Sequence, residues 1–387
     1  MTTDRYPIVV AGAGPVGLAL ALGLLRQGFA VLVFERRTRL ATDPRATTIQ
    51  PPVLEALADL GVLGAVDARG RRVTSLQYWD WGSERELLAN VPLNAMRDVS
   101  AYPWRLHCTQ PDLCAVLHEA VERELPGTVQ LGSRVSGFID RGDYVEVQVE
   151  GGGRPRTVRA SWLCGADGAQ SAVRKRLDTP VRQLAGVDTF LTCEVATPMH
   201  QLRGVEVGDA AFLFTALGPA LFMRMADCVR VLMLVDPEEG TASTRDPEAV
   251  ARIVFGAGSG VELRNRAVYT VQQQVATTWR QGRVLLLGDA AHATLPVSGT
   301  AMNTGILDGF LLAQALPDEA RVEQWERERR TELEGRVDAN ALAAHRFLTA
   351  DGWIARKNRR DYLTALGRNP TAARAHALRA SLLEDRT

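Results

Sequence analysis

The segment with the strongest consequence for the fold is a glycine motif near the N-terminus, residues 12–17 (GAGPVG). It follows a short apolar run at 7–11, opens a helical stretch at 16–26, and is followed by a second apolar run, AVLVFE, at 30–35. Strand, glycine turn, helix and strand in this order predict a βαβ unit, whose two strands are parallel. The chain is therefore predicted to contain a doubly wound α/β sheet.

The same motif predicts a bound dinucleotide. Gly12 permits the tight turn, Gly14 lets the backbone approach a pyrophosphate, and Gly17 allows the helix to pack closely on the strand. The helix N-terminus offers unpaired N–H groups to phosphates, and Glu35 can accept hydrogen bonds from ribose hydroxyls. The motif does not distinguish FAD from a nicotinamide cofactor. The alternative interpretation is a tight strand-to-helix turn that binds no ligand.

Two later motifs narrow this choice. Residues 164–168 (CGADG), followed by Ser171 and Arg174, resemble the DG motif of the para-hydroxybenzoate hydroxylase family, the group A FAD-dependent aromatic monooxygenases. Residues 286–292 (LLGDAAH), with the glycines and Asn303 that follow, resemble the GD motif of that family. The resemblance implies a Rossmann-like FAD-binding domain with a parallel sheet, a β-rich substrate domain and C-terminal helices.

Single positions between the motifs extend the resemblance. Arg45 matches a flavin-contacting arginine and Gln110 a flavin-contacting glutamine, although outside this context the first reads as a solvated loop residue and the second as a helix cap. Together the motifs and the resemblance assign cofactor binding to Gly12, Gly14, Val16, Gly17, Glu35, Arg36, Arg45, Gln110, Val135, Asp167, Asp289, Pro296, Gly299, Ala301, Met302 and Asn303.

The GD motif also has a chemical interpretation. Asp289 stands at the carboxyl end of a strand, where it can hold ribityl hydroxyls, and the turn from Gly299 leads into a helix whose N–H groups can face the flavin pyrimidine. We interpret His292 as structural. Family members commonly have glycine where this chain has Ala301, and if that position needs a positive φ the alanine costs about 1–2 kcal/mol. We expect a tolerated substitution, with a weakly held flavin as the alternative.

Apolar and polar segments predict the domain boundaries. A discontinuous FAD-binding domain is expected at 1–73, 106–179 and 277–345, and a substrate domain, mostly of short strands, at 74–105 and 180–276. Residues 346–387 are expected to form a C-terminal helical segment, and the segment after Gly309 is shorter than the family leads us to expect.

The substrate pocket is expected between the flavin and the second domain. No residue identifies itself as a catalytic base. Because neighbours in a strand point to opposite faces, Trp79 and Trp81 share a side that Tyr78 does not. Core packing is the alternative for each of the pocket candidates, which are Trp79, Trp81, Trp104, Phe212, Phe214, Phe222 and Met223.

Composition excludes several other functions. The formal net charge is zero, which argues against nucleic acid. The five cysteines and six histidines are dispersed and lack metal-site spacing, so no metal is expected. No signal peptide or membrane-spanning run is recognisable, and a cytoplasmic protein, monomeric or homodimeric, is expected.

The resemblance finally implies an activity. NADH or NADPH would reduce FAD transiently, molecular oxygen would form a flavin C4a-hydroperoxide, and this would hydroxylate an aromatic or polyketide-like small molecule. A flavin oxidase or reductase on the same fold, or a non-catalytic flavin-binding protein, are the alternatives.

Overall fold

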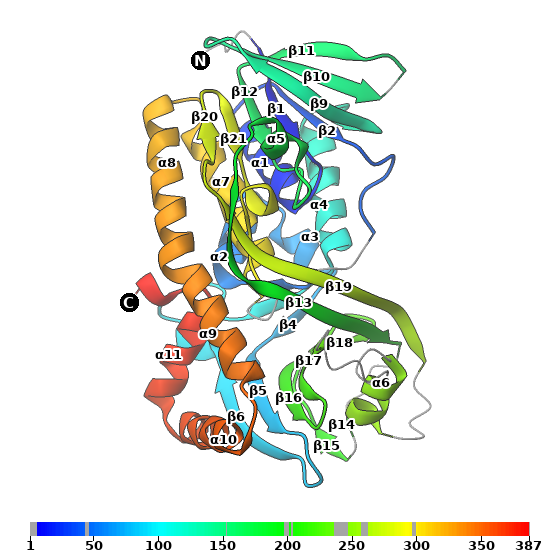
Figure 1. Cartoon of the computed structure of the whole chain (residues 1–387), viewed down its shortest axis with the longest axis vertical. Helices are drawn as coiled ribbons and strands as arrows, with labels where there is room; N and C mark the ends of the chain where they lie inside the picture. The colour runs from blue at the N-terminus through cyan, green and yellow to red at the C-terminus, as the bar shows by residue number, and fades with distance from the viewer. Residues whose placement is uncertain are drawn as a thin grey trace.

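The computed structural model describes residues 6–42, 46–151, 153–196, 201–202, 204–235, 247–256, 262–295 and 299–386. Two large sheets form the body of the molecule, and helices of the C-terminal part run along one side of both (Figure 1). The predicted fold class is confirmed: a parallel sheet with helices, a β-rich second part and C-terminal helices.

The first sheet contains the predicted βαβ unit. Helix α1 (Pro15–Arg26) joins β1 to β2 and packs against α4 (Gln110–Glu124) and α7 (Ala301–Ala315). All strands are parallel except β20 at the edge. In spatial order the strands are β20 (Arg280–Gln281), β21 (Val284–Leu286), β12 (Trp162–Gly165), β1 (Ile8–Ala11), β2 (Val31–Glu35) and β8 (Val129–Leu131).

A three-stranded antiparallel sheet, β9 (Ser133–Asp140), β10 (Val145–Gly151) and β11 (Arg156–Ala160), lies above the first sheet in Figure 1. The apolar pattern from Thr157 onward reads as one strand, but the structure divides it into β11 and β12. The break is at Ser161, whose N–H donates to the carbonyl of Pro7 where the chain changes sheets.

The second large sheet has eight strands. Most of these strands are short, as sequence analysis expected, but β13 and β19 are long. Register shifts within β13 interrupt the alternation that reveals a strand in the sequence. The strands in spatial order are β22 (His292–Ala293), β19 (Leu263–Ala276), β13 (Val181–Val195), β18 (Val229–Val235), β17 (Gly218–Arg224), β16 (Ala210–Thr215), β5 (Ser75–Asp80) and β6 (Glu86–Pro92).

Smaller elements complete the two parts. Strand β7 (Arg105–His107) pairs with β3 (Thr48–Ile49) and β4 (Arg71–Val73), and β14 (Gln201–Leu202) pairs with β15 (Val205–Glu206). The short helices are α2 (Pro51–Asp59), α3 (Leu63–Asp67), α5 (Ala172–Arg176), α6 (Pro247–Phe255), η1 (Leu93–Met96), η2 (Gly288–Ala290) and η5 (Glu384–Arg386).

The C-terminal helices connect the two large sheets. Helix α8 (Glu319–Glu332) continues through a π-helical turn, η4 (Leu333–Val337), into α9 (Asp338–Thr349), and this rod runs from one sheet to the other (Figure 1). Helices α10 (Trp353–Arg368) and α11 (Pro370–Ala380) pack on β6, where Leu363 and Leu378 share a core with Val91. The division into domains stays a prediction.

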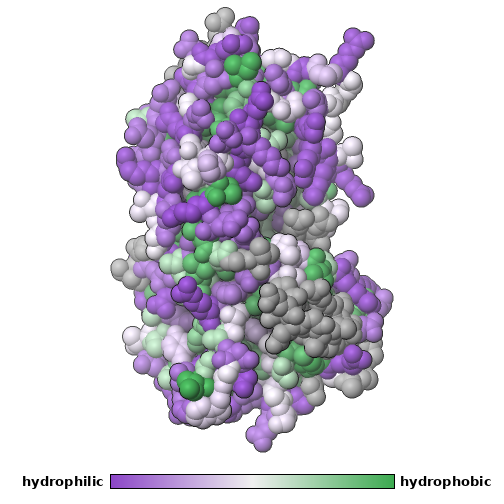
Figure 2. All heavy atoms as spheres, in the orientation of Figure 1, coloured by the Kyte–Doolittle hydropathy of each residue, from purple (hydrophilic) through white to green (hydrophobic). Residues whose placement is uncertain are grey.

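The surface is mixed. On the face shown in Figure 2, apolar residues form small patches separated by hydrophilic ones. None of the helices that the structure describes is long and apolar enough to cross a membrane.

Candidate cofactor and substrate site

The three sequence motifs meet at one edge of the parallel sheet. Strands β1, β12 and β21 are neighbours, and their last residues are in register: Ala11 pairs with Gly165, and Gly165 with Leu286. The first motif begins directly after β1, and the other two begin in the last residues of β12 and β21. The carboxyl edge of an open α/β sheet is where such folds bind their ligands, so segments up to 275 positions apart in the chain build one site (286 − 11).

The glycines of the first motif differ in their surroundings. A Cβ added to Gly12, whose φ is +103°, would lie 2.4 Å from the carbonyl oxygen of Ala166, and one added to Gly17 would lie 2.1 Å from the carbonyl oxygen of Gly12. A Cβ on Gly14 would meet no atom within 4 Å. Two of the glycines therefore permit packing, whereas Gly14 borders open space at the N-terminus of α1.

Glu35 holds the turn from the end of β2. Its carboxylate accepts hydrogen bonds from the N–H groups of Ala13 and Arg37, each at 2.9 Å. Each carboxylate oxygen has a further lone pair for a ribose hydroxyl. The next residue, Arg36, is exposed.

In the DG motif, the side chain of Asp167 caps the N-terminus of α5, which begins five residues later at Ala172. Its carboxylate accepts from the hydroxyl of Ser171 and from the N–H of Ala172 at 2.7 Å. The buried Arg174 then donates to the carbonyl of Ala290 at 2.9 Å, which ties the DG motif to the GD motif. Asp167 is thus held by its own helix, and contact with a cofactor stays a prediction for it.

The GD motif packs against the first motif through glycines. A Cβ on Gly288 would lie 2.9 Å from a methyl group of Val16, and one on Gly305 would lie 2.8 Å from it. Val16 therefore contacts η2 and α7 at the same time. Asp289, between these contacts, is exposed at the carboxyl edge of the sheet.

His292 is buried in a polar network beneath this edge. Its Nε2 lies 2.6 Å from a carboxylate oxygen of Asp308, and its ring stacks on Trp279 at 5.1 Å between ring centres. Asp308 also accepts from Arg329 and from the N–H of Gly288. Burial raises the pKa of Asp308, but His292 and Arg329 outweigh it, so that this pKa lies below its ordinary value. The network accounts for His292 without a role as catalytic base.

Asn303 holds the loop that precedes α7. Its side-chain nitrogen donates to the carbonyls of Thr48 and Gly299, both at 2.8 Å, and its side-chain oxygen accepts from the N–H of Gln50 at 2.7 Å. The left-handed residue of this loop is Gly299, with φ +63°. Ala301 is the first residue of α7 and is helical. Its methyl group therefore causes no left-handed strain.

The remaining residues predicted to bind the cofactor lie apart from the three motifs or outside the described residues. Gln110 is half-buried as the first residue of α4, and Met302 is partly buried against the main core. Val135 is a core residue of β9. Arg45 and Pro296 lie outside the described residues.

The cysteines are free thiols, and the potential metal ligands in the described part of the chain stay apart. All five cysteines are free, and burial raises the pKa of Cys108 and of Cys114 to about 12. Within the described ranges no group of three potential metal ligands comes together.

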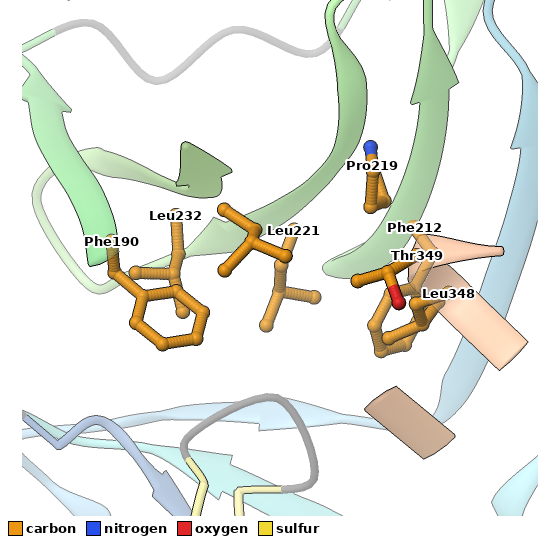
Figure 3. Close-up of a pocket in the computed structure, with 8 residues that line it drawn as sticks. Phe190, Phe212, Pro219, Leu221, Leu232, Leu348 and Thr349 are labelled. Carbon is orange, nitrogen blue, oxygen red and sulfur yellow. The ribbon is translucent and has the colours of Figure 1, made fainter. Parts of the chain in front are cut away.

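One face of the eight-stranded sheet carries an apolar pocket (Figure 3). Its only hydroxyl, that of Thr349, donates to the carbonyl of His345 at 2.8 Å. Arg230 precedes Leu232 by two residues on β18, so both point to the same face, and Arg230 donates to the hydroxyl of Thr47. The pocket face is therefore turned toward the segment that Asn303 holds. The lining residues are Phe190, Phe212, Pro219, Leu221, Leu232, Leu234, Leu348 and Thr349.

Some of the predicted pocket residues lie on this face. Phe212 lines the pocket, and Tyr78 stacks on it at 5.1 Å between ring centres. Met223 packs with two lining residues, and Phe214 with the core that contains Tyr78. Trp104 instead packs against the main core of the parallel-sheet part.

The other three candidates pack on the opposite face. Trp79, Trp81 and Phe222 belong to the core that includes α6, and the indole of Trp81 donates to the carbonyl of Ile253 in that helix. Trp79 and Trp81 do share a side that Tyr78 does not, as expected from strand alternation. These three side chains are therefore core residues, which was the alternative to a role in the pocket.

Sequence analysis missed most of the pocket. Period two along β17 relates Leu221 to the predicted Met223, and this signal could have found it. Leu348 and Thr349 follow from no sequence pattern, because the end of α9 reaches the sheet only through tertiary packing.

These features define an α/β protein with a discontinuous site that has the build of a dinucleotide-binding site, and with a separate apolar pocket on its eight-stranded sheet. The family model described as "FAD binding domain" matches residues 5–331, and the chain belongs to this family. The resemblance to group A flavin monooxygenases is thereby confirmed at the level of the family.

Similar proteins include two bacterial monooxygenases. The chain is 33% identical over 327 residues to the 6-methylpretetramide 4-monooxygenase of Streptomyces rimosus, covering 82% of this chain and 57% of that protein. It is 31% identical to the para-nitrophenol 4-monooxygenase of a Pseudomonas strain, with 80% and 77% covered. The crystal structure of a p-nitrophenol 4-monooxygenase of Pseudomonas putida superposes with a TM-score of 0.89 at 25% identity, covering 98% of both chains.

The residues present fit FAD. The open space at Gly14 adjoins the N-terminus of α1, which suits a pyrophosphate, and Glu35 lies at the end of the neighbouring strand. At Gly14 a side chain would contact no protein atom and would instead occupy the open space that suits the pyrophosphate.

Proposed function

We propose that this protein is a FAD-dependent monooxygenase that consumes NADH or NADPH and molecular oxygen to hydroxylate an aromatic or polyketide-like small molecule. The observation that carries the proposal is the apolar, partly aromatic pocket on the sheet face turned toward the three-motif site. Two of the relatives are named as monooxygenases of 6-methylpretetramide and of para-nitrophenol, which supports this substrate class.

Individual residues would hold the cofactor in distinct ways. The N–H groups at the start of α1 and the space at Gly14 would take the pyrophosphate, Glu35 the adenosine ribose, and Asp289 the ribityl chain. The loop from Gly299 to Asn303 would contact the ring system. When bound, FAD supplies the transfer of electrons from the nicotinamide nucleotide to oxygen and of an oxygen atom to the substrate.

The chain itself would orient the substrate and exclude water. The lining of the described pocket contains no charged side chain, and its one hydroxyl is engaged with the backbone. A flat apolar substrate would therefore bind there by contact with Phe212 and the neighbouring leucines. The first turn of α7 has no side-chain cap, so its N–H groups would stabilise negative charge on a ring bound in front of them.

Oxygen transfer tests the proposal. The purified protein with FAD is incubated with NADH or NADPH and a panel of phenols that includes para-nitrophenol and a tetracyclic polyketide. We expect substrate-stimulated nucleotide oxidation and one atom from ¹⁸O₂ in the product. Hydrogen peroxide without oxygenated product across the panel would favour the oxidase alternative, and no nucleotide oxidation at all would favour a non-catalytic flavoprotein.

A further inference from the structure

Gln50 carries a buried side-chain amide that has no hydrogen-bond partner within the described part of the chain. Its exposed fraction is 0%, and among the residues that the structure describes neither Nε2 nor Oε1 has a donor or acceptor. An amide buried in this way loses its hydrogen bonds to water without replacement. Such a group is retained at a cost in stability, which points to a partner that binds later.

The local sequence prevents the amide from satisfying itself. Gln50 precedes α2 at the N-cap position, where polar side chains usually accept from the first free N–H groups of the helix. The next two residues are Pro51 and Pro52, which have no N–H. The N–H of Val53 already donates to the backbone carbonyl of Gln50 at 3.0 Å. The amide is therefore free to bind something else.

The amide lies against the predicted flavin loop. The backbone N–H of Gln50 is fixed by Asn303, which also binds the carbonyl of Gly299. A Cβ added to Gly299 would lie 3.7 Å from Nε2 of Gln50. The loop and the amide are thus held together by the same side chain, at the end of the site where the ring system would bind.

Gln273 is a second buried amide, but it is only partly unpartnered. Gln273 also has an unpartnered atom, but its Nε2 donates to Asp338 at 2.6 Å, and the unpartnered atoms of this cluster, Gln273 Oε1 and Asp338 Oδ2, belong to two bonded residues. Both polar atoms of the Gln50 side chain remain open. A ligand that offers a donor and an acceptor side by side matches a primary amide.

We propose that the amide of Gln50 hydrogen-bonds to the imide edge of the FAD ring, which presents carbonyl oxygens on either side of an N–H. This inference rests on the proposed cofactor site. Gln50 is then a positioning residue: it fixes the ring against the loop that opens α7. It supplies no proton or electron.

The proposal predicts opposite effects on the free and the FAD-bound protein. In Gln50→Leu, a side chain of similar size removes the unpartnered amide, so the FAD-free protein should melt at a higher temperature than the wild type. The dissociation constant for FAD should rise about tenfold, because about one net hydrogen bond is lost. A residue with a merely structural role would not give this reversal.

A matched control and a charge reporter complete the experiment. In the eight-stranded sheet, the amide oxygen of Gln77 accepts from Trp79 and Gly208, so Gln77→Leu should lower the melting temperature and leave FAD affinity unchanged. Gln50→Glu introduces a carboxyl group beside the ring and should make the FAD midpoint potential more negative as pH rises and the carboxyl ionises.

The outcomes separate this inference from the proposed function. FAD affinity and midpoint potential are measured without substrate or turnover, so an inactive protein can still support the role of Gln50. If Gln50→Leu binds FAD with the affinity and spectrum of the wild type, the proposal is overturned. The amide would then be a partner of ordered water. A Gln50→Leu protein that melts at a lower temperature would overturn it as well, and so would a wild-type chain that does not bind FAD.

Discussion

Gly12 and Gly14 lie two positions apart but are glycine for different reasons. Alanine at Gly12 would combine a positive φ with a contact of 2.4 Å to a backbone carbonyl, whereas alanine at Gly14 would meet only open space. We expect Gly12→Ala to lose roughly 3 kcal/mol or more of unfolding free energy. We expect Gly14→Ala to change it by about 0.5 kcal/mol or less.

Their effects on the cofactor separate the two roles. Gly14→Ala should weaken FAD binding about tenfold or more, because its methyl group fills the space beside the helix N-terminus. Urea unfolding of the FAD-free proteins and fluorescence titration with FAD provide the two measurements. A Gly14→Ala protein that binds FAD as the wild type does would show that the pyrophosphate lies elsewhere.

Asn303 is a second residue whose role can be isolated. Asn303→Ala would leave a buried N–H and two carbonyls in the loop without a partner, which predicts a loss of about 2–4 kcal/mol of unfolding free energy. FAD affinity should fall as well, since the loop loses its anchor. Asn340, which donates one hydrogen bond to Glu384, is the control, and Asn340→Ala should cost about 1 kcal/mol or less.

Among the secondary structure elements, strand β18 places neighbouring side chains on opposite faces of the sheet, one toward the proposed substrate pocket and one toward the core. Leu232 points into the pocket, and the next residue, Met233, points into the core with α6. The same truncation at the two positions therefore tests which face binds the substrate.

Leu232→Ala should enlarge the pocket and change the KM for an aromatic substrate several-fold, whereas Met233→Ala should lower unfolding free energy by about 2–4 kcal/mol with little change in KM. Steady-state kinetics and urea unfolding of both variants provide the comparison. A shift in KM with Met233→Ala but not with Leu232→Ala would place the substrate site off this face.

For the whole molecule, two buried histidines determine the response to acid. Burial lowers the pKa of His107 to about 4 and that of His376 to about 4, against an ordinary value of about 6.5. Between these values the unfolded chain binds protons that the folded chain does not. Unfolding free energy should therefore fall as pH falls from about 6.5 to about 4, with a slope approaching 1.4 kcal/mol per pH unit for each histidine.

Urea unfolding between pH 7.5 and 4.5 measures this slope. A variant carrying His107→Gln and His376→Gln should be less stable at pH 7.5, because the bonds to Arg224 and Tyr78 change, but its slope should be shallower. Equal slopes for variant and wild type would contradict the assignment. The lowered pKa of Asp308 adds stability that is lost only at still lower pH.

The amino-acid sequence alone predicts the features that depend on neighbouring residues. Glycine spacing and apolar runs located the βαβ unit, whose helix was expected at residues 16–26 and is α1, Pro15–Arg26. The cofactor class followed from the order of three motifs. Each of these signals is local, because a turn, a cap or an amphipathic face is specified within a few residues.

Tertiary packing alone determines how these parts meet. The register that aligns Ala11, Gly165 and Leu286, and the bonds by which Asn303 joins Gly299 to Gln50, connect residues more than a hundred positions apart. The same holds for the pocket, whose lining includes Phe212 but excludes Trp79 because the sheet turns opposite faces to α9 and α6. Hydrophobicity is non-directional, so the sequence marks a side chain as buried without saying against what it packs.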